Sequence, residues 1–171
     1  MHSEVWQAAL GLDAVGIAAR IPHAGSMSLL QAVRGVDAQQ LLALASSHRL
    51  PSNPLVRDGR LGAACGVEYA AQAMALHGAL TAQAEHSDGE TSGAPEAARA
   101  GYLVSVRNLV LQVQRLDDIA ADVLVHVSKA GDNGAFTVYD FALTADEPVA
   151  RPLLSGKAYV MLQAAMEGGE A

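Results

Sequence analysis

Apolar and polar positions alternate through the C-terminal half of the chain. From residue 101 onward, apolar side chains recur at every second position in successive runs: Tyr102–Val104–Val106, Leu109–Leu111–Val113, Val123–Val125–Val127 and Tyr139–Phe141–Leu143, with a last apolar run at 154–162. A period of two is typical of strands that bury one face. The parity of the pattern changes near Arg107 and Asn108, which predicts a β-bulge there.

Turn signals separate these predicted strands. Gly131-Asp132-Asn133-Gly134 predicts a hairpin, and Asp146-Glu147-Pro148 predicts a second turn. Consecutive strands that are joined by short turns imply an antiparallel sheet.

Residues 63–83 predict the one long helix of the chain. This stretch is rich in alanine and contains no proline. It is small and apolar nearly all round, so we expect a sheet to enclose it on most sides. The polar residues 84–100 that follow predict a long surface loop, and residues 167–171 predict a frayed tail.

The N-terminal part gives weaker signals. Residues 5–20 are compatible with a short helix, and the apolar pattern of 33–46 fits a strand or a helix equally. Pro51 and Pro54 interrupt any regular element, and residues 57–60 predict a turn. Together the patterns predict a single α+β domain over 1–171. In it, a curved antiparallel sheet wraps around one central helix and leaves an open edge suited to dimerisation.

Composition excludes several classes of protein. The 171 residues carry a net charge of −7, which disfavours broad binding to nucleic acid. The sequence has no apolar run of about 18 residues and no secretory leader pattern, and it has one cysteine, Cys65. We therefore expect a cytoplasmic protein without a membrane span. Arg49, Arg57 and Arg60 gather locally, and we interpret them as a solvated loop.

Glu68 is the first candidate for chemistry. It is the only charged residue between Arg60 and Glu85, and it falls within the predicted enclosed helix. Burial of a carboxylate is costly unless a partner compensates it, so the position points to a functional group or to a glutamate at a dimer seam. Gln72 lies one turn later on the same face, where it can orient the carboxylate, bind a substrate carbonyl or satisfy the backbone of the sheet.

Other candidates are weaker. His77 lies nine residues after Glu68, on the opposite helix face at roughly 100° per residue, and is predicted to be a structural or a surface histidine. Cys65 is predicted to pack as a small hydrophobe. The histidines and the cysteine follow no spacing typical of a metal site.

Two stretches resemble the hotdog-fold β-hydroxyacyl-ACP dehydratases. The first is similar to the opening of that family: Ile21-Pro22-His23-Ala24-Gly25-Ser26-Met27-Ser28-Leu29-Leu30. The second is similar to its helix signature: Asn53-Pro54-Leu55, Gly59 and Gly66-Val67-Glu68-Tyr69-Ala70-Ala71-Gln72-Ala73-Met74-Ala75. More narrowly, the chain resembles the predicted 3-hydroxyacyl-ACP dehydratases associated with aryl polyene synthesis.

The resemblance implies a hotdog fold and loss of water from a 3-hydroxyacyl thioester carried on phosphopantetheine, without a cofactor of the protein's own. In this family a histidine before the helix removes the α-proton, and an acid on the helix of the neighbouring subunit protonates the hydroxyl. Glu68 matches the acid. Gly66 lies near the helix start, whose backbone amide would hold the thioester carbonyl, and Gln72 is a second candidate for substrate binding.

The chain departs from the family at the base. Asn53 occupies the position of the family histidine, and an amide cannot take up a proton at neutral pH. His48 is a possible substitute. Three interpretations stay open: an active dehydratase that uses Glu68 with another base, a half-site subunit of a heterodimer, and a thioesterase in which Glu68 activates water and Asn53 positions it. Expected partners are an acyl carrier protein or a CoA thioester, and a second hotdog subunit in a homodimer or a heterodimer.

Overall fold

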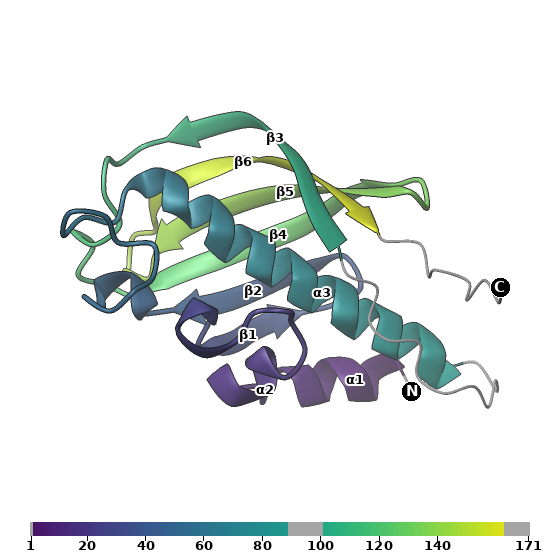
Figure 1. Cartoon of the computed structure of the whole chain (residues 1–171). Helices are drawn as coiled ribbons and strands as arrows, with labels where there is room; N and C mark the ends of the chain where they lie inside the picture. The colour runs from purple at the N-terminus through teal and green to yellow at the C-terminus, as the bar shows by residue number, and fades with distance from the viewer. Residues whose placement is uncertain (1, 89–100, 163–171) are drawn as a thin grey trace, which may run out of the picture.

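The computed structural model describes residues 2–88 and 101–162. Its centre is a six-stranded antiparallel sheet in the order β1-β2-β4-β5-β6-β3. The strands are β1 (Ala32–Val36), β2 (Gln40–Ala45), β3 (Gly101–Leu111), β4 (Val123–Asp132), β5 (Phe136–Ala145) and β6 (Arg151–Leu162). Figure 1 shows the sheet curving around the long helix α3 (Gly66–Asp88), which confirms the predicted α+β arrangement.

The C-terminal strands are not a simple meander. β4, β5 and β6 follow one another as neighbours, but β3 pairs with β6 at the far edge of the sheet and not with β4. The sheet is antiparallel as predicted, but the expectation that short turns join all consecutive strands is wrong between β3 and β4. Residues 112–122 cross from β3 to β4, and this connection is too long for a hairpin turn.

The predicted bulge and turns are present. The pairing of β3 with β6 shifts register between Arg107 and Val110, and Asn108 has a positive φ of 52°. In the β4–β5 hairpin the side chains of Asp132 and Asn133 accept backbone N–H groups of the turn. Such side-chain bonds are the reason that aspartate and asparagine mark turns in a sequence.

The ambiguous segment at 33–46 is a hairpin of two strands. Its turn is closed by Asp37, whose carboxylate accepts the backbone N–H groups of Gln39 and Gln40. β2 pairs with β4 along its whole length, and four of its apolar side chains are buried: Leu41, Ala43, Leu44 and Ala45. Upstream, α1 (His2–Ala9) and α2 (Ala14–Ala18) lie beyond the β1 edge, and α1 contacts α3 (Figure 1).

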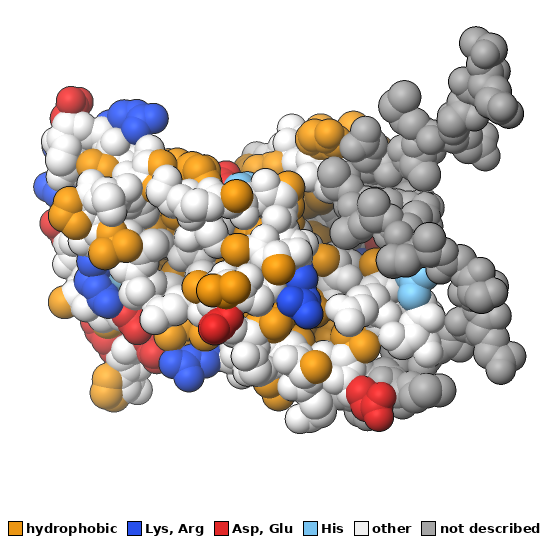
Figure 2. Space-filling view, turned by 60° about the horizontal axis from the view of Figure 1, so that its bottom comes forward, with side chains coloured by type: hydrophobic (Ala, Val, Ile, Leu, Met, Phe, Trp, Pro, Cys, Tyr) orange, Lys and Arg blue, Asp and Glu red, His pale blue; other side chains and the backbone are white. Residues whose placement is uncertain are grey.

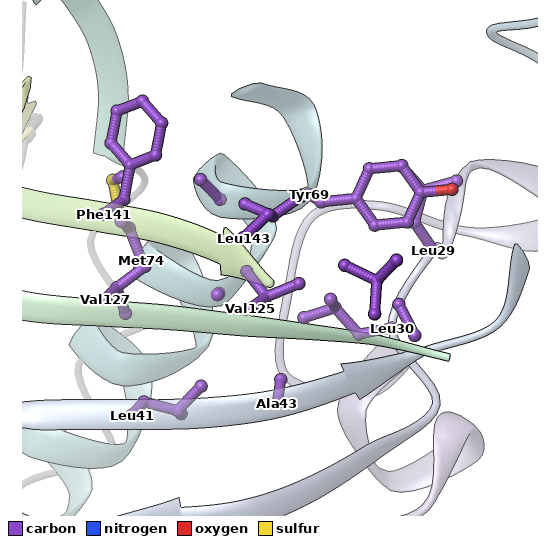
Figure 3. Close-up of a cluster of buried hydrophobic side chains, with 14 of the residues drawn as sticks. Leu29, Leu30, Leu41, Ala43, Tyr69, Met74, Val125, Val127, Phe141 and Leu143 are labelled. Atoms are coloured by element: carbon purple, nitrogen blue, oxygen red, sulfur yellow. The ribbon is translucent and has the colours of Figure 1, made fainter. Parts of the chain in front are cut away.

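The core fills the space between α3 and the concave face of the sheet. Figure 3 shows Tyr69 and Met74 of the helix among side chains from β2, β4 and β5. Alanines at 70 and 73 are fully buried, and their small size lets the sheet approach the helix closely.

Two details of the helix differ from expectation. The helix extends to Asp88, into the segment predicted as a loop, while residues 89–100 and the predicted tail lie outside the described residues. The sheet covers one side of α3, but Ala71, Ala75 and Ala79 are only partly buried and Gly78 is exposed. Within a single chain the helix is therefore covered on most sides and partly open along this one stripe.

Among the described residues, none of the helices is both long and apolar enough to cross a membrane. On the face seen in Figure 2, lysine and arginine side chains stand in small separate groups, some of them beside aspartate and glutamate side chains.

Candidate active site

A histidine that the sequence did not identify as a catalytic group lies against Glu68. The Nε2 atom of His23 is 3.0 Å from Oε1 of Glu68, and both side chains are partly buried, with exposed fractions of 25% and 31%. His23 comes just before the short 3-10 helix η1 (Gly25–Met27), and Glu68 lies in the first turn of α3. The fold thus brings together one residue from each of the two stretches that resemble the dehydratases.

Gln72 lies next to this pair. It is completely buried, and its Nε2 donates to Oε1 of Glu68 at 3.1 Å and to the Met27 carbonyl at 2.7 Å. Its Oε1 accepts the Leu29 N–H at 2.9 Å. Both amide hydrogens are therefore used within the chain. The assignment of Gln72 to substrate binding stays a prediction, and a substrate carbonyl would have to displace one of these bonds.

The hydrogen bonds restrict the tautomer of the His23 ring. Since an ionised Glu68 only accepts, Nε2 of His23 carries the hydrogen that joins the two side chains. The other ring nitrogen, Nδ1, is buried and has no hydrogen-bond partner among the described residues. In the neutral ring Nδ1 then holds a free lone pair, which is the feature a general base requires.

The sequence offered a weak signal for this arrangement. His23 belongs to the motif Ile21-Pro22-His23, but nothing in the spacing connects it with a helix that begins at Gly66. The proposed substitute, His48, is buried and its Nε2 bonds the Ile119 carbonyl at 3.0 Å. Burial lowers the pKa of His48.

Asn53 and Gly66 are both engaged within the chain. Asn53 is buried, and its Nδ2 bonds the Ser47 carbonyl and the Tyr69 hydroxyl. The N–H of Gly66 donates to the Ala63 carbonyl of the 3-10 turn η3 (Ala63–Cys65), so a thioester carbonyl would have to compete for it. The assignments of Asn53 to catalysis and of Gly66 to carbonyl binding stay predictions.

The remaining candidates lie apart from the pair. His77 is buried and bonds the Tyr139 hydroxyl and the Asp37 carbonyl, as expected for a structural histidine. Arg57 and Arg60 flank an exposed turn. Arg49 pairs with Asp122 at 2.6 Å.

Two hollows on the surface are separate from the His23–Glu68 pair. One, of about 280 Å³, is lined by residues of β1, β2 and β4 on the side of His126, and the other, of about 270 Å³, lies beside Lys129. Neither of these two hollows includes His23 or Glu68. In the described part of the chain, no group of three or more histidine, cysteine, aspartate or glutamate side chains could hold a metal ion.

Comparison with known proteins identifies the family. The family model described as "ApeP-like: ApeP dehydratase" matches residues 15–164. The chain belongs to this ApeP-like family of dehydratases. None of the curated proteins matches its sequence significantly.

Solved structures show that this ApeP-like chain has the hotdog fold. The dehydratase heterocomplex ApeI:P from Xenorhabdus doucetiae matches with a TM-score of 0.68 and 16% identity, over 88% of this chain and 93% of that chain. A thioesterase family protein from Silicibacter pomeroyi matches with a TM-score of 0.59 and 10% identity, over 96% of this chain and 100% of that chain. At these identities the likeness establishes the fold alone.

Proposed function

We propose that this ApeP-like protein removes water from a 3-hydroxyacyl thioester carried on the phosphopantetheine of an acyl carrier protein, in the cytoplasm and in polyene-type synthesis. The observation that carries the proposal is the His23–Glu68 contact, in which the free Nδ1 atom supplies the base that Asn53 cannot provide. Family membership supports the reaction class. The reaction is redox-neutral and needs only proton transfers, so it calls for no resident cofactor.

The proton movements balance within the pair. Nδ1 of His23 takes the α-proton of the thioester, and the electron pair of that C–H bond forms the new C=C bond. The C–O bond at the β-carbon breaks, and the imidazolium returns its proton to the departing hydroxyl, which leaves as water. The Glu68 carboxylate holds the ring and stabilises its positive charge while the proton resides there.

The exposed edge of the sheet supports a second hotdog protein as the partner. β3 is the end strand, and it exposes large apolar side chains: Leu103, Val104, Leu109, Val110 and Leu111. An apolar edge strand is a site for pairing with another chain. The heterocomplex among the structural matches favours a different hotdog subunit over a second copy.

The proposed function is tested by replacing His23 with alanine in the protein purified with any hotdog partner that accompanies it. We expect His23→Ala to lower the rate of enoyl-thioester hydration, the reverse reaction, at least 100-fold. His126→Ala is the matched control, because His126 bonds Gln40 on the outer surface. Full activity of His23→Ala would refute the proposal. Release of free thiol from an acyl thioester, measured with a thiol-reactive dye, would show a thioesterase instead.

A further inference from the structure

The segment that carries His23 has little regular structure of its own. Residues 24–28 form one 3-10 turn, in which Gly25 has a positive φ of 60° and Ser28 N–H bonds the Gly25 carbonyl. A single 3-10 turn has poor hydrogen-bond geometry and gives this segment little rigidity of its own. The position of His23 against Glu68 therefore depends on groups that hold the end of the turn from outside.

Gln72 holds the turn from the helix side. One amide group bonds the Met27 carbonyl, the Leu29 N–H and the Glu68 carboxylate. The same side chain therefore sets the distance between the His23 turn and Glu68.

A second group holds Leu29 from the other side. The Ser47 hydroxyl donates its only hydrogen to the Leu29 carbonyl at 2.9 Å. It must then accept from the Tyr69 hydroxyl, which lies 2.9 Å away. Burial raises the pKa of Tyr69, so its hydroxyl keeps the hydrogen it donates. Figure 3 shows the Tyr69 ring beside Leu29.

Asn53 completes this chain of bonds. Its Oδ1 accepts the Leu55 N–H at 2.9 Å, which identifies Nδ2 as the donor toward the Ser47 carbonyl and the Tyr69 hydroxyl. The hydrogen bonds therefore run in one direction. Asn53 donates to Tyr69, Tyr69 donates to Ser47, and Ser47 donates to the Leu29 carbonyl. An amide supplies two hydrogens from one nitrogen and an acceptor beside it, and histidine has no equivalent.

We infer that Asn53, Tyr69 and Ser47 are positioning residues, which hold the His23 turn in place against Glu68 through the Leu29 backbone. The inference rests on the proposed function. It assigns Asn53, at the position of the family histidine, to positioning His23 and not to proton transfer. Asn53 acts on the reaction through the base, without contacting the substrate.

The test compares two tyrosine variants. Tyr69→Phe removes the central hydroxyl of the chain. Tyr139→Phe is the matched control, because it also removes a buried hydroxyl, but one that bonds His77. We expect Tyr69→Phe to lower kcat about tenfold with KM within about twofold, because small displacements of a catalytic group are costly. We also expect faster hydrogen exchange at the Leu29 amide and altered ¹⁵N signals of the His23 ring. Tyr139→Phe should change none of these.

The outcomes separate the inference from the proposed function. Wild-type kcat in Tyr69→Phe, or an equal loss in both tyrosine variants, overturns the inference. If His23→Ala keeps its activity, the proposed function fails, and the Leu29 exchange and His23 signals still decide whether the chain of bonds holds the turn.

Asn53→His provides an independent test. If position 53 needed a base, this variant would gain activity, whereas the inference expects a loss. Because an imidazole cannot donate to Ser47 and Tyr69 from one nitrogen, we expect this variant to lose activity about tenfold. A gain in activity would overturn the inference and return the base to position 53.

Discussion

The Nε2 atom of His23 and the Oε1 atom of Glu68 lie 3.0 Å apart within a single chain. The resemblance implied a histidine and an acid contributed by neighbouring subunits, with substrate carbons between them. A direct hydrogen bond leaves no space for a carbon skeleton between these two groups. Under the proposed function, the substrate would have to reach Nδ1, which is buried in the free chain, while Glu68 acts on the ring through Nε2.

Two substitutions of Glu68 should separate orientation from charge. Glutamine keeps an oxygen that can accept the Nε2 hydrogen of His23 but loses the negative charge, whereas alanine removes both. We expect Glu68→Gln to lower kcat about tenfold and Glu68→Ala about 100-fold, since proton-transfer groups typically contribute within this range. Single-turnover hydration of an enoyl thioester measures both rates. Equal losses in the two variants would mean that the charge or the acidic proton of Glu68 carries its role, and that its acceptor oxygen adds little.

Much of the fold followed from local patterns. The alternation of Val123, Val125 and Val127 predicted a strand with one buried face, and these side chains are buried in β4. The parity change at Asn108 predicted the bulge. These features depend on neighbours in sequence, and a pattern records such neighbours directly.

Other features depend on contacts between distant segments. Pairing of β3 with β6 is decided by the whole sheet, so the order of the strands in the chain does not reveal it. The same holds for the site. Glu68 stood out by its isolation in an apolar helix, but His23 acquires its meaning only when the turn after it is folded against Gln72.

The edge of β3 should determine assembly. Val104 is 53% exposed on the end strand, and Val104→Lys places a charge where we propose that a second hotdog subunit pairs. We expect this variant to dissociate the complex, measured by size-exclusion chromatography with light scattering. Val149→Lys is the matched control, because Val149 is 83% exposed in the β5–β6 turn. Unchanged mass for Val104→Lys would contradict pairing through β3.

Gly66 and Gly78 should respond to alanine in opposite directions. A Cβ atom at Gly66 would collide with Leu154 and lie 3.1 Å from a methyl group of Leu143, whereas at Gly78 it would meet nothing within 4 Å. We expect Gly66→Ala to reduce the free energy of unfolding by about 1–3 kcal/mol through overpacking. Gly78→Ala should raise it by up to about 1 kcal/mol, because alanine favours the helix. Denaturant unfolding measures both changes. If Gly66→Ala leaves the free energy of unfolding unchanged, overpacking does not explain the glycine, and the predicted binding of the thioester carbonyl remains as its explanation.

Acid should destabilise the fold through two buried histidines. Desolvation lowers the pKa of His77 and of His48 below the ordinary value of 6.5. As the pH falls, the unfolded chain therefore takes up protons before the folded chain does. The stability that the two neutral histidines contribute is complete above about pH 6.5 and is lost as the pH falls below it. Each histidine contributes a limiting slope of about 1.4 kcal/mol per pH unit until its folded form is also protonated.

The carbonyl of Asp37, which accepts from Nε2 of His77, opposes this shift, and the positive charge of Lys129 adds to it. Removal of the titrating group tests the origin of the acid sensitivity. His77→Gln retains an N–H donor for the Asp37 carbonyl but cannot be protonated near neutral pH. We expect its free energy of unfolding to fall less steeply between pH 6.5 and 5 than that of the wild-type protein, in urea titrations at each pH. His126→Gln, at a half-buried site on the outer face of the sheet, is the matched control for the loss of an imidazole. A slope that His77→Gln leaves unchanged would assign the acid sensitivity to His48 or to the carboxylates.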